Sequence, residues 1–366
     1  MKYALQVFTG SRNASGCRAG EIIRKIGAFA AKAEVGRVII GWSRDTSVYR
    51  EVASFLHRSG IQMLLWLPVF SEIPESLHPD HAEDVFGNRV ALSGVQEEEG
   101  FRFVCPSSGH NARIVEGIWE KHFSDCGFDG VFLDRVRGYT FTAGVSGMLS
   151  CACGRCRNAF LAKGVDPVQV RALYESLECA FFDMASWPAD GEFIPEHPVV
   201  RRFFETREEI ISGAVHEIVL YFKRLGLTVG LDLFAPVISR LAGQNRRLIA
   251  EGADFIKPML YRRTEAPAGI GFELALFEKN APGARGLVRP AMDVPFLHTQ
   301  FEALENVPCE VCPGFEINYD QKLVRTDAGY IRESLAAARD YGFGSAALCW
   351  NVMQAPEVHM EAAVFP

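Results

Sequence analysis

The most distinctive chemical feature of the sequence is a run of three closely spaced cysteines, Cys151-Ala-Cys153-Gly-Arg-Cys156. Three thiols at this spacing can converge on one borderline-soft cation, and zinc is the usual choice of such ligands. The glycine inside the run lets the chain turn tightly around the ion. The run therefore predicts one part of a metal site, with three free thiols as the alternative interpretation.

A tetrahedral zinc needs a fourth ligand. Cys105 is the best candidate, because it lies just before an expected helix in a loop that should neighbour the cysteine run. The pair Cys309 and Cys312 is a weaker candidate, since it falls inside an apolar run. Four thiolates would leave no coordination position open for substrate, so we expect a structural metal rather than a catalytic one.

Three carboxylates lie near the C-terminal ends of apolar runs: Asp134, Asp232 and Glu316. Each shares an alternating face with a glycine lower in the same run. An unpaired buried carboxylate costs several kcal/mol, so packing alone does not explain acids at these positions. We expect them to form an active site, with a structural ion pair between Asp134 and the arginines that follow it as the alternative.

Aromatic and polar side chains occur at corresponding positions of the other runs. Aromatic rings suit the apolar faces of sugars, and amides and charged groups suit their hydroxyls. The expected substrate-binding residues are Trp42, Trp66, Arg135, Arg137, Lys257, Tyr261, Asn318, Trp350 and Asn351. Lys257 lies well below the end of its run, which favours a buried ion pair with a neighbouring acid.

Eight short apolar runs alternate with amphipathic stretches along the chain. The runs are 3–8, 37–42, 61–67, 128–134, 228–234, 254–261, 310–317 and 345–350, and helical patterns fill 21–35, 47–59, 112–125, 199–225 and 326–341. Continuous apolar runs suit strands buried on both faces, and eight strand–helix units are what a closed parallel barrel requires. We therefore predict a (β/α)8 TIM barrel. An open doubly wound sheet is the alternative, but no glycine-rich phosphate loop follows the first run.

Two long excursions interrupt this alternation, at residues 71–100 and 138–198. Both leave the C-terminal ends of strands, where barrel enzymes build their sites. We expect residues 1–366 to form one barrel domain with an insertion at 138–198 that carries the cysteine run. Within this insertion, Trp187, Asp190, Glu192 and His197 could reach substrate, although loop surface is the simpler interpretation.

The overall composition narrows the possible partners. The formal net charge of -7 argues against nucleic acid, which needs a basic face on the protein. No apolar run is long enough to span a bilayer, and the polar N-terminal residues make a poor secretory signal. These features predict a cytoplasmic protein that does not bind membranes.

A cysteine before the third helix, followed by a C-x-C-x-x-C run after strand four, resembles the zinc site of family 42 β-galactosidases and related barrel hydrolases. The resemblance implies a glycoside hydrolase with a carbohydrate substrate, a structural zinc on Cys105, Cys151, Cys153 and Cys156, and possible homo-oligomers. That family carries an Asn-Glu pair at the end of strand four, where this chain has Leu133-Asp134.

Strand four also resembles the chitinase signature D-G-x-D-x-D-x-E. Asp129 and Asp134 match its first and third acids, but Phe132 and Val136 replace the middle aspartate and the acid-donating glutamate. We therefore do not expect chitinase chemistry.

Glycoside hydrolysis typically uses two carboxyl groups that flank the scissile bond. The family resemblance implies Asp134 as general acid/base and Glu316 as nucleophile. The rival assignment has Asp134 as nucleophile and Asp232 or Glu316 as acid. Two other functions stay open, namely a barrel that binds carbohydrate without cleaving it and a Schiff-base aldolase that uses Lys257.

Overall fold

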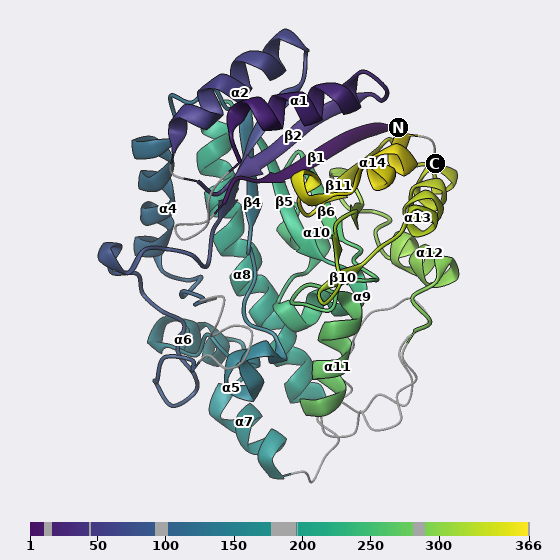
Figure 1. Ribbon diagram of the computed structural model, residues 1–366. Coiled ribbons are helices and arrows are strands. Elements are labelled where there is room, and N and C mark those ends of the chain that lie inside the picture. The colour runs from purple at the N-terminus through teal and green to yellow at the C-terminus, as the bar shows by residue number, and fades with distance from the viewer. Residues whose placement is uncertain are drawn as a thin grey trace.

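The computed structural model describes residues 1–10, 17–43, 45–91, 102–176, 195, 197–280 and 290–364. Parallel strands close into a barrel in the order β5-β4-β3-β2-β1-β11-β8-β6, and β6 pairs with β5 to complete the ring. The strands are β1 (Lys2–Phe8), β2 (Val35–Gly41), β3 (Gln62–Pro68), β4 (Gly130–Asp134), β5 (Thr228–Phe234), β6 (Phe255–Met259), β7 (Glu310–Val311), β8 (Gly314–Glu316) and β11 (Ser345–Cys349). The predicted (β/α)8 barrel is confirmed (Figure 1).

Helices surround the strands. Outside the connection that follows β4, the main helices are α1 (Ala19–Ala30), α2 (Thr46–Arg58), α4 (Gly109–His122), α8 (Pro198–Arg224), α11 (Ile270–Asn280), α12 (Val294–Glu302), α13 (Ala328–Tyr341) and α14 (Glu357–Val364). Several begin at a side chain that accepts a hydrogen bond from the first turn, as Asp45 does for α2, Ser108 for α4 and Asp327 for α13. Such caps satisfy backbone N–H groups that have no partner within the helix.

The seventh barrel position differs from the single strand that the sequence predicts. It is divided into β7 and β8 around Pro313, whose nitrogen carries no hydrogen to donate to a ladder. The ring stays closed here because the Cys312 N–H donates to Ile256 O and the Ala347 N–H donates to Pro313 O. Helix α1 is also shorter than the predicted 21–35, because β2 already begins at Val35 and pairs with Tyr3.

A column of stacked side chains fills the barrel interior. The Arg37 guanidinium lies 4.1 Å from the centroid of the Phe255 ring, which stacks on Phe132 with centroids 5.9 Å apart. The Lys257 ammonium then lies 5.4 Å from the Phe132 centroid. Gly230 makes room for this column, because a Cβ at that position would lie 2.1 Å from the Phe255 ring.

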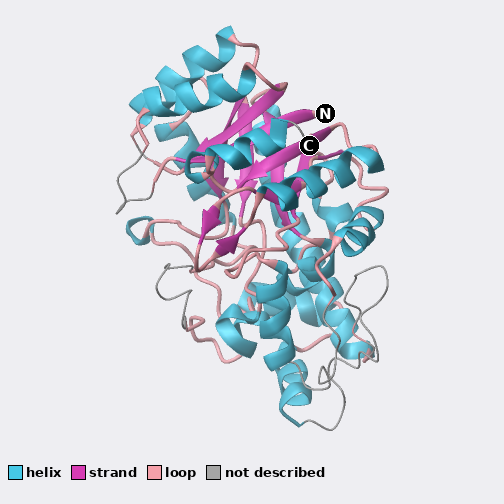
Figure 2. Cartoon of the chain, turned by 45° about the vertical axis from the view of Figure 1, so that its right-hand side comes forward, coloured by secondary structure: helices cyan, strands magenta, loops and turns pink. Residues whose placement is uncertain are grey.

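The long connection after β4 carries its own small helices. These are η2 (Phe141–Ala143), α5 (Gly144–Met148), α6 (Gly154–Ala162) and α7 (Pro167–Ser176). In Figures 1 and 2 helices gather on the side of the barrel toward which the strand arrows point. Trp187, Asp190 and Glu192, the possible substrate contacts of this insertion, lie outside the described residues, as does the end of the first excursion at 92–100.

No helix in the described part of the chain is both long and apolar enough to cross a membrane.

Replacing Gly230 by alanine should lower the free energy of unfolding by about 1–3 kcal/mol, because the added methyl overpacks the Phe255 ring. Urea unfolding followed by circular dichroism measures the change. Gly117→Ala is the matched control, since nothing lies within 4 Å of its Cβ position in the middle of α4. That substitution should stabilise the fold by about 0.5–1 kcal/mol. Equal effects of the two substitutions would contradict the packing argument.

Candidate active site and metal centre

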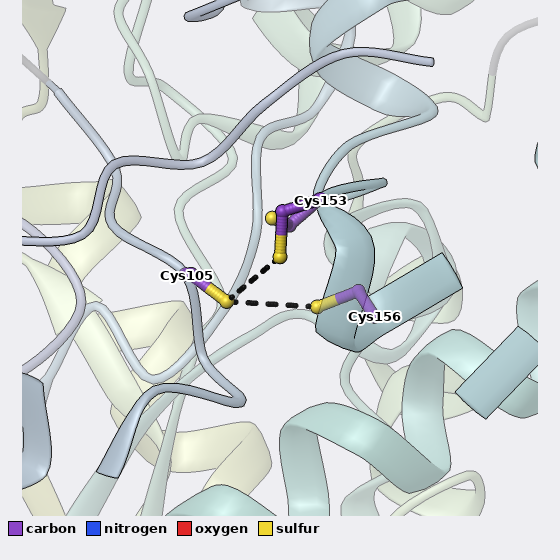
Figure 3. Close-up of side chains that lie close together, drawn as sticks. Cys105, Cys153 and Cys156 are labelled. Atoms are coloured by element: carbon purple, nitrogen blue, oxygen red, sulfur yellow. Dashed lines mark hydrogen bonds between the residues drawn. The ribbon is translucent and has the colours of Figure 1, made fainter. Parts of the chain in front are cut away.

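Four cysteine sulfurs converge beside the barrel mouth. The Sγ atoms of Cys105, Cys151, Cys153 and Cys156 all lie within 4.8 Å of one another, and all four residues are buried and free of disulfides. The Cys105 sulfur lies 3.4 Å from that of Cys153 and 3.6 Å from that of Cys156 (Figure 3). The structure thus brings together the four cysteines that the sequence predicts.

These sulfur positions fit a tetrahedral metal site. A zinc–sulfur bond of 2.3 Å in tetrahedral geometry separates neighbouring sulfurs by about 3.8 Å. The observed separations of 3.4 and 3.6 Å are close to that value. Four soft donors in a buried site are compatible with zinc or another thiophilic cation.

The loop that carries Cys105 is held by a network of polar side chains. Asn111 at the start of α4 accepts the Asp80 N–H at 2.9 Å and donates to Cys105 O at 3.0 Å. Ser108 donates to the Asp80 carboxylate at 2.6 Å. Asp80 also forms an ion pair with Arg155, which lies inside the cysteine run. The two loops that supply sulfurs are therefore tied to each other by an ion pair as well.

A buried arginine links the cysteine run to the barrel. The guanidinium of Arg207 in α8 donates to Ser150 O at 3.1 Å, Leu241 O at 2.8 Å and Tyr139 O at 2.6 Å. Ser150 directly precedes the first cysteine of the run. Since Arg207 is buried, each of these contacts replaces a hydrogen bond to water and fixes the loop against α8.

A cavity of about 250 Å³ opens at the C-terminal ends of the barrel strands. Seven of the predicted site residues line it: Trp66, Asp134, Arg135, Arg137, Asp232, Tyr261 and Trp350. Its remaining walls are formed by Gln6, Phe234, Met259, Thr264, Ala266, Pro267, Ala268 and Leu323. The cavity thus combines two carboxylates and two guanidiniums with an apolar surface.

Asp134 has a hydrogen-bond donor on each carboxylate oxygen. The Trp66 indole N–H donates to Oδ2 at 2.8 Å, and the Arg135 backbone N–H donates to Oδ1 at 2.6 Å. Arg135 adopts a left-handed φ of 55°, a strained conformation for a residue with a side chain. Its own guanidinium forms an ion pair with Glu72 at 3.1 Å. Among the described residues no arginine lies within ion-pair distance of Asp134, in contrast to the alternative that the sequence left open.

Asp232 is a buried acid paired with Lys257. The Lys257 ammonium lies 3.1 Å from Asp232 Oδ2, while Oδ1 has no hydrogen-bond partner among the described residues. Burial raises the pKa of Asp232 to about 7, with the nearby Asp134 charge adding to the shift and Lys257 opposing it. This carboxyl can therefore hold a proton near neutral pH.

Lys257 lies inside the barrel, fully buried, and its ion pair confirms the interpretation that the sequence favours. The ammonium also donates to Gln6 Oε1 and to the Tyr261 hydroxyl, each at 3.0 Å. The Asp232 charge helps to raise the pKa of Lys257 against the effect of burial. An ionised, fully bonded amine does not suit Schiff-base formation, which needs a free amine.

Glu316 is fully buried and does not line the cavity as far as the described residues form it. Its Oε1 accepts the Arg263 backbone N–H at 2.6 Å, and its Oε2 accepts the Tyr330 hydroxyl at 2.9 Å. Burial raises the pKa of Glu316 to about 7, and the two hydrogen bonds oppose the shift. Glu316 therefore ties the loop after β6 to α13.

The remaining predicted residues support the mouth from outside the cavity. Asn318 accepts the Asn351 backbone N–H at 2.9 Å, and Asn351 accepts the Phe8 backbone N–H at 3.2 Å. Trp42 packs edge-on against Trp66 and Phe8, with ring centroids 5.5 Å away in both cases. These contacts position the strand ends and the Trp66 indole.

Sequence reasoning missed several cavity residues. Gln6 had a detectable signal, because it is the one polar residue inside the first apolar run, YALQVF. The loop residues Thr264, Ala266, Pro267 and Ala268 had no such signal in the sequence except that they follow a strand. Small and apolar loop residues carry no chemical signature. Glu273, a buried acid of α11, was also missed; it accepts the Ala268 N–H at 3.2 Å and so fixes the cavity loop.

Comparison with known proteins informs on the fold. The sequence matches no protein-family model and no curated protein. The structure resembles the glycoside hydrolase domain of PgaB (BpsB) from Bordetella bronchiseptica, with a TM-score of 0.62 and 12% identity over 100% of this chain and 98% of that one. It also resembles an α-L-fucosidase from Paenibacillus thiaminolyticus, with a TM-score of 0.57 and 12% identity over 99% of this chain and 48% of that one. The β-amylase catalytic domain of Paenibacillus polymyxa is similar with a TM-score of 0.56 and 10% identity over 99% of this chain and 98% of that one. At these identities the likeness shows a shared barrel fold, and the resemblance to family 42 stays a prediction.

Glu316 should make the fold less stable as the pH rises. Because its pKa is about 7 in the folded chain and 4.5 as a free side chain, the folded state holds a proton that the unfolded state releases between these values. Raising the pH through this window should therefore cost up to about 3 kcal/mol of unfolding free energy. Glu316→Gln keeps an acceptor for Arg263 and should make the dependence shallower.

Urea unfolding at pH 5 and pH 8 measures this difference. The exposed Glu51→Gln variant is the control and should behave like the unmodified chain. An unchanged pH dependence in Glu316→Gln would show that Glu316 is ionised throughout the range.

Proposed function

We propose that this protein is a glycoside hydrolase that uses Asp134 and Asp232 as its pair of carboxyl groups. The observation that carries the proposal is their position in one cavity, at the C-terminal ends of the adjacent strands β4 and β5, in different environments. Glycosidases need one ionised and one protonated carboxyl on either side of the scissile bond. Two donors to Asp134 suit a carboxylate, and a pKa of about 7 suits Asp232 as the acid.

In this proposal Asp232 donates its proton to the glycosidic oxygen as the bond from that oxygen to the anomeric carbon breaks. The Asp134 carboxylate attacks the anomeric carbon and forms a glycosyl ester. Water then attacks the same carbon, gives its proton to Asp232 and releases Asp134. Lys257 stabilises the Asp232 carboxylate formed in the first step, at the observed separation of 3.1 Å.

The alternative pairing of Asp134 with Glu316 has less support. Both Glu316 oxygens are occupied by donors from the protein, and the side chain is fully buried. A nucleophile must reach the anomeric carbon, whereas this carboxylate faces the loop after β6 and α13. We assign Glu316 to positioning that loop.

We also propose that the four cysteines bind a structural zinc. The separations of the sulfurs and the buried, all-thiol donor set support this assignment. The residues that would hold the ion are Cys105, Cys151, Cys153 and Cys156. When bound, zinc would join the loops after β3 and β4 beside the cavity, and it would contribute to stability rather than to the reaction.

Hydrolysis of aryl glycosides should separate the roles of the two aspartates. Asp134→Asn should lower the rate at least about 1,000-fold for every leaving group, because it removes the nucleophile. Asp232→Asn should cost as much for alkyl and poor aryl leaving groups but far less for 2,4-dinitrophenol, which departs without a proton. Release of the phenol, measured by absorbance across a panel of sugars, gives the rates.

Asp129→Asn is the matched control, because Asp129 directly precedes β4 at the N-terminal end of the strand, away from the cavity. Its carboxylate accepts a hydrogen bond from the Met63 N–H at 2.7 Å. It should leave the chemistry unchanged and lower only stability. If the unmodified chain binds sugars but hydrolyses none of these substrates in any linkage, the protein is a carbohydrate-binding barrel instead.

The purified chain should contain one zinc per molecule by plasma mass spectrometry. Cys153→Ser should lose the metal and lower the free energy of unfolding by at least about 2 kcal/mol, because metal binding is coupled to folding. Cys17→Ser, at a cysteine away from the cluster, should keep both metal and stability. Full stability of Cys153→Ser, or an unmodified chain free of metal after growth with added zinc, would contradict the assignment.

A further inference from the structure

Arg137 is a buried arginine in the wall of the cavity. Its side chain follows β4 and is clamped between two aromatic rings, with the guanidinium carbon 4.7 Å from the Phe103 centroid and 4.5 Å from the Phe234 centroid. Only 7% of the residue is exposed, and it lines the same cavity as Asp134 and Asp232. These two ring contacts hold the guanidinium beside the cavity.

Most hydrogen-bonding capacity of this guanidinium is unused. An arginine has five N–H donors, and among the described residues Arg137 uses one, from Nη1 to Gly138 O at 3.0 Å. No carboxylate oxygen of the described residues lies within ion-pair distance of it. The charge of Glu273 acts on Arg137 from farther away, while that carboxylate accepts hydrogen bonds from Ala268 and Thr140.

Other buried arginines of this chain are different. Arg207 donates to three carbonyl oxygens. Arg262 donates to Met292 O, to Glu333 and to the Ser334 hydroxyl, and only its Nε has no partner among the described residues. Among the described residues no nitrogen of Arg137 is both buried and unpaired, so its unused donors are open to the cavity rather than enclosed in the protein. At Arg137 the unused donors belong to a residue that lines a cavity, which points to a ligand.

We propose that Arg137 binds a carboxylate carried by the substrate sugar, so that the preferred substrates are glycosides of a hexuronic acid. This inference rests on the proposed glycosidase function. A planar guanidinium with free parallel N–H groups matches a planar carboxylate in a bidentate pair. A monoanion is favoured over a phosphate dianion, because the Asp134 carboxylate adds negative charge to the same cavity.

The rest of the cavity suits the body of such a sugar. Trp66 and Trp350 supply aromatic surface, while Met259, Pro267 and Leu323 supply aliphatic surface for ring C–H groups. The polar groups Gln6 and Thr264 lie in the same wall for ring hydroxyls. The volume of about 250 Å³ suits a ligand of the size of a monosaccharide better than a long chain.

Calorimetric titration with free sugars tests the inference without requiring turnover. Glucuronate and galacturonate should bind the unmodified protein roughly 10- to 100-fold more tightly than glucose and galactose, as expected for a charge-assisted bidentate pair. Arg137→Met keeps an apolar side chain between the two rings and should abolish this preference. Arg137→Lys keeps the charge without the planar pair of donors and should retain only part of it.

Arg37→Met is the matched control. It also removes a guanidinium stacked on a phenylalanine ring, but Arg37 lies at the start of β2, at the opposite end of the barrel. It should leave the uronate preference unchanged. Melting curves of all three variants show which are folded. If Arg137→Met is unfolded, the inference is tested by comparing the uronate preference of Arg137→Lys with that of Arg37→Met.

Equal affinity for uronates and neutral sugars, or a preference that survives in Arg137→Met, would overturn the inference. Tighter binding of glucose 6-phosphate than of glucuronate would also overturn it. Hydrolysis of neutral glycosides without any uronate preference would refute the inference and keep the proposed function. If uronates bind in a way that depends on Arg137 but no uronide is hydrolysed, the proposed hydrolase function is refuted. Carboxylate binding by Arg137 is then still supported.

Discussion

The ion pair between Lys257 and Asp232 is the interaction on which the rest of the barrel mouth depends. It lies between the packed interior and the cavity, with the ammonium above the Phe132 ring and the Asp232 carboxyl lining the cavity. A buried charge without a partner would cost several kcal/mol, so the Lys257 ammonium depends on the oxygens of Asp232, Gln6 and Tyr261 that surround it. The pair also balances charge at the mouth, because Arg135 is paired with Glu72 and Asp134 is held by neutral N–H donors.

The two sides of the cavity are held by different means. On the β3 and β4 side, the four cysteines, the Asp80 network and Arg207 fix the long loops. On the β6 side, Glu316 and Glu273 each accept a backbone N–H of the loop that follows Tyr261. Both acids are buried and neither is needed as a reacting group. The acids that line the cavity and the acids that shape it are therefore distinct sets.

The sequence predicted the barrel strands and the run of three cysteines because both depend on local patterns, and the position of Cys105 followed from the order of the barrel loops. Apolar runs of strand length occupy both faces of each barrel strand, and C-x-C-x-x-C brings three sulfurs together within one turn of chain. The acids were harder to assign. Alternation along the strand predicts that the Glu316 side chain points toward the barrel mouth. In the structure its carboxyl group bonds the Tyr330 hydroxyl and the Arg263 backbone N–H and does not line the cavity among the described residues. Nothing local distinguishes it from Asp232.

Cavity walls built from loops could not be predicted for a related reason. Ala266, Pro267 and Ala268 carry no functional groups. Their loop is held by two acids, Glu273 close by in the sequence and Glu316 far along the chain, which accept the Ala268 and Arg263 N–H groups. Gln6 is the opposite case, since a polar residue inside an apolar run is visible in the sequence, and its partner Lys257 lies 251 positions away.

Closure of the ring by β1 and β11 has a consequence for synthesis. Lys2 pairs with Ser345, and the Tyr3 hydroxyl donates to Ala363 O at 2.7 Å, so the first strand made finds one neighbour only when the last strand has left the ribosome. At about 5–20 residues per second, that wait lasts roughly 20 to 70 s. During this time one edge of β1 carries unpaired backbone groups and an apolar face, which are the features that chaperones and other nascent chains recognise.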